Sequence, residues 1–431
     1  MKGMKPIFII ISLLMSSNLS AVDTLRLTNC KLLAREHYPL AKQKGLFGES
    51  LALTLQSLST ASYFPKFNIA GEASYQSEVT GFPIALPVGL GLEPLAKDQY
   101  RAVLNIQQTV FDGNRSQAGK AVERLNIQEQ EQMNEADMLN VEQQVQQIYF
   151  NGLLQQKAKE NLLLTKQVLE ERIRHAQSAL RNGLVLQRDL NLLVVQLRTI
   201  EKQIAEATLN QQSCVKMLAL ITDSDFNENS AFALPATPLI PDKELENQRP
   251  EMQAFDTRIN RFAANKSMLN TQLTPTVQLY GTLGYGRPGL NMLSNNFDPF
   301  YIVGIRLNWT PWDGNLIHQQ KKNLDIQSKI LANQKAAFDT NIRTQAQQKR
   351  YDIQKQETLL KQDEEIAKLR QTITKESAAQ LDNGAITTSD YIADLNAETQ
   401  ARIGVEITKI QLIKAQLDYL LILGNNQIYQ P

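Results

Sequence analysis

The chain has 431 residues, with 45 Lys and Arg against 44 Asp and Glu, and it contains only 2 Cys. This balance of charge argues against a nucleic-acid-binding protein, which needs a basic surface to neutralise phosphates. Two cysteines exclude a disulfide scaffold and a multi-cysteine metal cluster. Because 42% of the residues are hydrophobic, the chain is not intrinsically disordered.

The first residues have the pattern of a secretory signal peptide. Lys2 and Lys5 precede an apolar stretch over Ile7–Met15, and small and polar residues follow as far as Ala21. The apolar stretch is too short to remain as a membrane anchor. We therefore expect residues 1–21 to be removed on export, and the mature protein to carry no lipid at its N-terminus.

Strands are predicted from alternating apolar and polar residues. The alternation covers Phe67–Tyr75 and Arg101–Thr109, and it returns in Thr276–Tyr285 and Val303–Thr310. A period of two gives each strand one apolar and one polar face. This pattern suits either a soluble half-buried sheet or a membrane barrel with a lipid side and a watery side. Loops over 81–99 and 286–300 join the strands in pairs.

Two very long helices follow these strand pairs. Residues 115–181 and 316–381 are rich in Gln, Glu, Leu and Ala, which favour helix, and contain no proline. Asn182–Gly183 and Asn383–Gly384 are predicted to end them, because glycine tolerates the left-handed backbone of a helix terminus. Helix is predicted to resume near Arg188 and Ser389, giving two helical hairpins.

The strands and hairpins form an internal repeat. The segment LNIQQTVFDGN at 104–114 corresponds to IRLNWTPWDGN at 305–315, and both tip glycines follow at equal spacing. We expect repeat 1 over 22–218, a linker with a small equatorial subdomain over 219–250, repeat 2 over 251–424, and a tail over 425–431. If the sheet lies in a membrane, four strands are too few to close a barrel. Open edges are not tolerated in lipid, so the chain must oligomerise, and three copies would supply twelve strands.

The sequence contains no convincing catalytic, cofactor-binding or metal-binding motif. Gly284, Gly286 and Gly289 match G-x-G-x-x-G, but a proline and an Asn-rich loop follow where a dinucleotide site needs a helix. His37, His175 and His318 lack the spacing of metal ligands. We expect no enzyme activity, no cofactor and no bound metal.

These features together resemble the TolC-like outer-membrane efflux family, over essentially the whole mature chain. The resemblance rests on the signal peptide, the duplicated strand pair, the Phe-Asp-Gly and Trp-Asp-Gly turns, and the tip motifs NGLVLQRDL and NGAITTSDY. Ile386 occupies a position where many members carry an arginine, which puts the salt-bridge gating of the family in doubt. The resemblance implies a mainly helical protein whose homotrimer forms a twelve-stranded barrel in the outer membrane and a helical tunnel across the periplasm.

The implied function is that of an exit duct. Such a duct conducts substrates passively from a tripartite efflux pump or a type I secretion system, with a periplasmic adaptor (membrane fusion) protein and an inner-membrane transporter as partners. The alternative is a structural coiled-coil protein of the envelope with a soluble sheet. That sheet would need a covering layer, and the sequence offers no apolar element to provide it.

Several residues are candidates for functional sites. Asp189 and Asp390 are predicted to form negative rings at the periplasmic entrance, although each could instead stabilise the start of a helix. Adaptor docking is expected at the tips, with small or apolar surface from Gly183, Leu184, Gly384 and Ala385, where glycine could also serve only to end a helix.

At the barrel–helix junctions, Phe111 and Trp312 are expected either in an interfacial aromatic belt or in packing at the bend. Gly113 and Gly314 are expected to absorb the change of direction there. Cys30 and Cys214 are predicted at similar heights, from about 1.5 Å of rise per helical residue. They could form a disulfide or remain two buried thiols.

Overall fold

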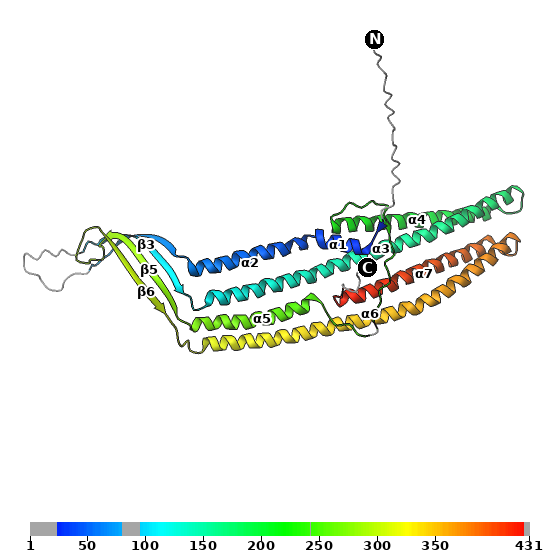
Figure 1. The fold of residues 1–431 in the computed structure, drawn as a ribbon. Coiled ribbons are helices and arrows are strands. Elements are labelled where there is room, and N and C mark those ends of the chain that lie inside the picture. The colour runs from blue at the N-terminus through cyan, green and yellow to red at the C-terminus, as the bar shows by residue number, and fades with distance from the viewer. Residues whose placement is uncertain (1–23, 80–94, 242, 426–431) are drawn as a thin grey trace, which may run out of the picture.

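The computed structural model describes residues 24–79, 95–241 and 243–425. The predicted signal peptide, most of the first strand-connecting loop and the end of the tail lie outside these residues. The molecule is elongated, with a sheet at one end and two helical tips at the other (Figure 1).

Four antiparallel strands form the sheet in the order β2-β3-β5-β6. Their bounds are β2 Lys66–Tyr75, β3 Asp98–Phe111, β5 Thr276–Arg287 and β6 Asp298–Asn308. The first three cover the segments in which the alternating pattern predicted strands, whereas β6 ends at Asn308, two residues before the predicted end at Thr310. A register irregularity lies between Thr109 and Phe111. The alternation thus identified the sheet, because side chains on a strand point to opposite faces in turn.

The long helices connect directly to the strands. They are α3 Arg115–Arg181 and α6 Leu316–Asp382, each of 67 residues. Their return helices are α4 Gln187–Thr222 and α7 Thr388–Ile422. At about 1.5 Å per residue, each long helix measures roughly 100 Å. The two predicted hairpins are therefore confirmed, with boundaries within one or two residues.

Shorter helices lead up to the sheet. They are α1 Leu27–His37, α2 Pro39–Tyr63 and α5 Pro250–Asn270, followed by the 3-10 turn η1 Thr271–Leu273. Proline at the first position of α2 and α5 is favourable, since it lacks only an N–H that has no partner inside the helix. In Figure 1, α2 and α5 run alongside α3 and α6 between the sheet and the middle of the molecule.

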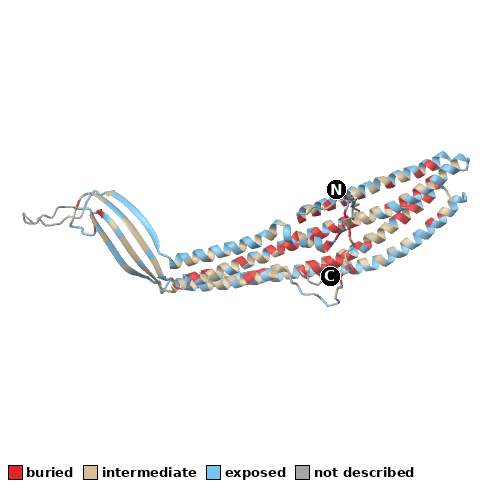
Figure 2. Cartoon of the chain, turned by 45° about the horizontal axis from the view of Figure 1, so that its top comes forward, coloured by how far each residue is buried: buried red, intermediate tan, exposed pale blue. Residues whose placement is uncertain are grey.

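The core is thin and lies between helices at mid-length and near the tips. Figure 2 shows buried residues concentrated along α3, α4 and α7, while α2 and much of α6 are exposed. The central cluster includes Tyr149, Phe150 and Leu218, and a second cluster near the tips includes Leu169 and Tyr391. The long hairpins therefore pack as a single curved wall of helices.

The segment between the repeats adds a small parallel strand pair that the sequence pattern did not reveal. β1 Thr24–Leu25 pairs with β4 Ala231–Phe232. The Tyr149 hydroxyl bonds the carbonyl oxygens of Leu25 at 2.8 Å and Ala233 at 2.6 Å. α4 extends to Thr222, so the segment between helices is shorter than the predicted 219–250 linker.

Candidate functional site

One face of the sheet is a continuous apolar surface. The register places Phe67 opposite Ile106, and Leu283 lies opposite Leu104 on one side and Tyr301 on the other. Nine large apolar side chains of this face are more than half exposed: Phe67, Ile69, Tyr75, Leu283, Tyr285, Tyr301, Val303, Ile305 and Leu307. Because a side chain of this kind gains about 1.5–3 kcal/mol on leaving water, an uncovered face of this size favours contact with an apolar phase.

The opposite face of the sheet is polar. Asn68, Asn105 and Thr282 occupy one row across three strands. The Thr282 hydroxyl lies 2.9 Å from the Asn105 side-chain oxygen. The two faces are therefore built for different environments, as the alternating sequence predicted.

Both edges of the sheet are open. β2 and β6 are the outer strands, and each has one neighbour within the described chain. β2 and β6 run in opposite directions, because every neighbouring pair is antiparallel and the sheet has an even number of strands. A second copy could therefore continue the antiparallel sheet by pairing its β2 with this chain's β6.

The two Asp-Gly turns join the sheet to the long helices. Gly113 and Gly314 have φ of 66° and 68°, and the asparagines that follow them are also left-handed. The Asp112 carboxylate accepts hydrogen bonds from the N–H groups of Asn114 at 2.9 Å and Ser116 at 2.8 Å. The Asp313 carboxylate likewise accepts from the Ile317 N–H at 2.7 Å. In both turns the aspartate binds free N–H groups at the start of the helix, and glycine permits the change of direction.

Phe111 and Trp312 lie beside these turns and are 44% and 77% exposed. Exposure suits the interfacial alternative better than packing within this chain, because a ring packed at the bend would be covered. The aromatic belt stays a prediction, since its test requires lipid.

The helical tips end in matching backbone motifs. At the first tip, the Gly183 N–H bonds the Leu180 carbonyl at 3.0 Å, and the Leu184 N–H bonds the Ala179 carbonyl at 2.9 Å. At the second tip, the N–H groups of Gly384 and Ala385 make the equivalent bonds. Both glycines have φ near 70°, and a Cβ added to either would meet nothing within 4 Å. Glycine therefore closes the helix, while the Leu184 side chain stays 76% exposed.

The two tip aspartates have different surroundings. Asp390 forms a capping box, in which its carboxylate accepts the Thr387 N–H at 3.0 Å and its own N–H bonds the Thr387 hydroxyl. The Thr387 hydroxyl also donates to the Asp390 carboxylate at 2.7 Å, and this bond, together with the one from the Thr387 N–H, lowers the pKa of Asp390. Asp189 lies in the first turn of α4, where the capping position is Leu186 and no side-chain cap forms. Asp390 therefore stabilises the start of its helix by capping, as the alternative expected. Asp189 does not cap its helix.

Side chains also connect the two hairpins near the tips. Arg172 of α3 pairs with Asp382 of α6 at 2.6 Å, and its guanidinium lies 5.1 Å from the ring centre of Tyr391 of α7. Burial raises the pKa of Tyr391, whose side chain is in the tip cluster. Sequence reasoning missed this link, because Arg172 and Asp382 are 210 residues apart and neither belongs to a tip motif.

Further hydrogen bonds extend this connection. The hydroxyls of Thr165 and Thr399 are 2.9 Å apart, and Gln196 donates to Asn396 at 2.6 Å. Any separation of the hairpins at this end has to break these contacts.

The two cysteines are free and lie in the same central core cluster. Burial raises the pKa of Cys30 to about 11 and also raises the pKa of Cys214. Thiols held protonated in this way are poor nucleophiles. Of the two alternatives, the structure therefore shows two buried free thiols.

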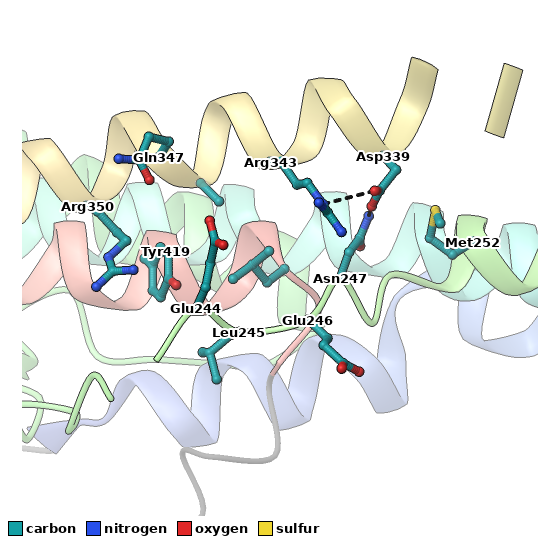
Figure 3. Close-up of a pocket in the computed structure, with 12 residues that line it drawn as sticks. Glu244, Leu245, Glu246, Asn247, Met252, Asp339, Arg343, Gln347, Arg350 and Tyr419 are labelled. Carbon is teal, nitrogen blue, oxygen red and sulfur yellow. Dashed lines mark hydrogen bonds and ion pairs between the residues drawn. The ribbon is translucent and has the colours of Figure 1, made fainter. Parts of the chain in front are cut away.

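A pocket of about 360 Å³ lies where the connecting segment, which joins α4 to α5, crosses α6 and the end of α7 (Figure 3). Its wall includes the Asp339 carboxylate, which bonds Asn247 at 3.0 Å and Arg343 at 3.0 Å. Tyr419 lines it from α7 and is 1% exposed, and its hydroxyl has no hydrogen-bond partner among the described residues. The Asp339 contacts fasten the connecting segment to α6.

The described residues contain no cluster of three or more potential metal-ligating side chains. Gly284 and Gly286 lie within β5, and Pro288 rather than a helix follows the strand. This arrangement cannot present a helix N-terminus to a pyrophosphate. None of the helices in the described part of the chain combines the length and apolarity required to cross a bilayer.

Comparison with known proteins relates part of this chain to a sequence family. Residues 52–222 match the sequence model of the family described as outer membrane efflux protein. The resemblance expected from the strand pairs and tip motifs is therefore confirmed. Among curated proteins, none matches the chain significantly in sequence.

Solved structures of outer-membrane proteins and channels share the fold over most of the chain. A crystal structure of CusC gives a TM-score of 0.71 at 13% identity, covering 92% of this chain and 91% of CusC. The outer membrane protein VceC of Vibrio cholerae gives 0.67 at 14%, covering 92% and 96%. The CmeC outer membrane channel of Campylobacter jejuni gives 0.63 at 18%, covering 93% and 85%. At these identities the likeness concerns the fold.

Proposed function

We propose that the protein is the outer-membrane exit duct of a tripartite efflux pump or type I secretion system. The observation that carries this proposal is the uncovered apolar face of a four-stranded sheet that stands at one end of long helices. The match of residues 52–222 to the outer membrane efflux protein family and the likeness to outer-membrane channels support it. The sheet would lie in the outer membrane, and the helices would extend into the periplasm. The chain is proposed to act as a passive conduit and to have no catalytic activity.

The proposed assembly is a homotrimer. Three copies of the four-stranded sheet give twelve strands, an even number within the range of known membrane barrels. Closure would satisfy the open edges of β2 and β6, whose unpaired backbone groups are not tolerated in lipid. The apolar face would then point outward to lipid, and the polar face would line the lumen.

The alternative of a structural coiled-coil envelope protein requires a layer over the apolar face. Nine large apolar side chains of that face are more than half exposed in the described chain. Nothing among the described elements provides the cover, so the duct is favoured.

The proposal is tested by purifying the mature protein from membranes and adding it to planar lipid bilayers. We expect a heat-labile trimer in detergent and stepwise conductance in the bilayer. A protein recovered as a water-soluble species without conductance would support the structural alternative.

The tips are proposed to dock the periplasmic adaptor, because they lie farthest from the membrane end. Gly183, Gly384 and Ala385 offer small exposed surface, and Leu184 offers an exposed apolar side chain. Leu184→Glu should abolish adaptor binding and export while leaving the trimer intact. The same change at Leu239, which is 90% exposed in the connecting segment, serves as the matched control. Equal effects of the two variants would contradict tip docking.

The tip aspartates are proposed to line the periplasmic mouth. Three copies of Asp189 and Asp390 would attract cations in a narrow passage. Replacing both by Asn should reduce cation selectivity and block by trivalent cations. Unchanged values would leave these residues with a structural role only.

A further inference from the structure

The half of the sheet's polar face nearest the helices carries positive charge alone. One row across the strands contains Lys66, Gln107, Tyr280 and Gly304, and the adjacent row towards the helices contains Thr109, Gln278 and Arg306. Towards the far end, two rows without charged residues follow: Asn68, Asn105, Thr282 and Ile302, then Ala70, Val103, Gly284 and Phe300. Carboxylates of this face first appear in the next row, where Glu72 and Asp298 lie with Arg101.

Arg306 is held against the sheet by an aromatic ring. Tyr280 lies directly opposite Gly304, and a Cβ on that glycine would come within 2.6 Å of the Tyr280 hydroxyl oxygen. The ring therefore lies across the glycine and presents a face. The Arg306 guanidinium carbon is 4.9 Å from the ring centre, within the range of a cation–π interaction.

This charge is not neutralised by a carboxylate. Neither Arg306 nor Lys66 forms an ion pair with any residue in the described part of the chain. Asp112 and Asp313 lie at the helix end of the sheet, and their carboxylates are hydrogen-bonded to N–H groups at the start of α3 and α6. The stacked guanidinium keeps N–H groups that can donate to a passing anion.

A similar stack at the far end of the sheet has acidic neighbours. Arg101 lies 6.0 Å from the ring centre of Phe300, and that ring lies across Gly284. Glu72 and Asp298 occupy the same row as Arg101, so this level has no excess of positive charge. The excess of positive charge on the polar face is therefore confined to the end of the sheet nearest the helices.

We infer that Arg306 and Lys66 form a basic ring in the lumen where the tunnel opens into the barrel, and that this ring favours the passage of anionic solutes. The inference rests on the proposed function, which turns the polar face inward. Lys66 lies on β2 and Arg306 on β6, the two edge strands, so neighbouring protomers would bring them to each seam. Charged rings in a narrow pore attract ions of opposite sign and repel like ions. Solutes with carboxylate, phosphate or sulfate groups would therefore be attracted at this level of the lumen, whereas the tip aspartates act on cations at the periplasmic mouth.

The test measures the reversal potential of full-length trimers in bilayers under a KCl gradient. The variant with Arg306→Gln and Lys66→Gln should raise the permeability of K⁺ relative to Cl⁻ by about twofold or more. Arg306→Lys keeps the charge and should stay close to the unmodified protein. Lys243→Gln, which removes one positive charge from the exposed connecting segment, is the control and should change nothing.

A second measurement uses the unmodified protein, so it does not depend on the folding of a variant. Inorganic tripolyphosphate added on the barrel side should reduce the current, and the double variant should be less sensitive. Conducting trimers with unchanged selectivity and unchanged block in the double variant would overturn the basic ring and leave the duct intact. Absence of any conductance from the unmodified trimer would instead refute the proposed function and this inference with it.

Discussion

The two junction glycines offer a matched test of how the sheet is joined to the helices. Gly113 and Gly314 have nearly equal positive φ, so Gly→Ala at either position forces alanine into a left-handed backbone. That strain costs about 1–2 kcal/mol. The surroundings differ, because a Cβ on Gly314 would meet nothing within 4 Å, whereas a Cβ on Gly113 would overlap the Thr274 hydroxyl.

The difference between the two variants follows from that hydroxyl. The Thr274 hydroxyl lies 2.9 Å from the Gly113 carbonyl oxygen and 2.7 Å from that of Thr271. It would have to turn away from the new Cβ, which weakens a hydrogen bond worth about 1 kcal/mol. The Pro275 carbonyl oxygen would lie 3.2 Å from the new Cβ and adds to the crowding. We expect Gly314→Ala to destabilise the protein by about 1–2 kcal/mol and Gly113→Ala by roughly 2–4 kcal/mol per chain.

The assay is urea denaturation of the purified protein in detergent, followed by far-ultraviolet circular dichroism. The unmodified protein, both single variants and Gly113→Ala combined with Thr274→Ala are compared at one protein concentration. The combined variant should recover part of the extra loss at Gly113. Equal destabilisation by the two single variants would refute the role assigned to Thr274, and no loss in either would refute the strain argument.

Three further outcomes are expected. Tyr149→Phe should destabilise the protein by about 1–3 kcal/mol in the same assay, because it removes the hydroxyl that the Leu25 and Ala233 carbonyls share as a donor. Tyr419→Phe should be neutral within about 0.5 kcal/mol, because its hydroxyl has no partner among the described residues. The reverse order would contradict the hydrogen bonding described. The pKa of Asp390 is lowered from 3.8, so its cap should protect the start of α7 from hydrogen exchange above pH 3.8 and lose this effect as the pH falls through the lower folded pKa. Asp189→Asn should leave exchange at its own tip unchanged, because Asp189 forms no cap. Protection at the start of α7 that does not change with pH would contradict the role given to the Asp390 cap. Mass spectrometry of the unreduced, denatured and alkylated protein should find both cysteines alkylated, and an intact bond between them would show that the exported protein oxidises.

Much of the fold could be predicted because its signals are local and repeated. Alternation along Phe67–Tyr75 shows a half-exposed strand, and the absence of proline over 115–181 shows an uninterrupted helix. The asparagine–glycine pair at 182–183 ends that helix by a backbone preference that needs no distant partner. The same signals recur in the second repeat.

Other features were out of reach because they depend on distant pairing. β1 and β4 have two residues each, too few for an alternating pattern, and they are about 200 residues apart in the chain. The link from Arg172 to Asp382 depends on how the two hairpins pack. By contrast, Thr387 and Asp390 have the spacing of a capping box, so this signal was present in the sequence and was overlooked.

The most direct test of the proposed duct is the mass and conductance of the intact assembly. Native mass spectrometry of the detergent-extracted mature protein should give three chains, and the same preparation should form ion-conducting pores in a planar bilayer. A monomer that remains soluble without detergent and does not conduct would contradict the proposal that the apolar face of the sheet meets lipid in a closed barrel.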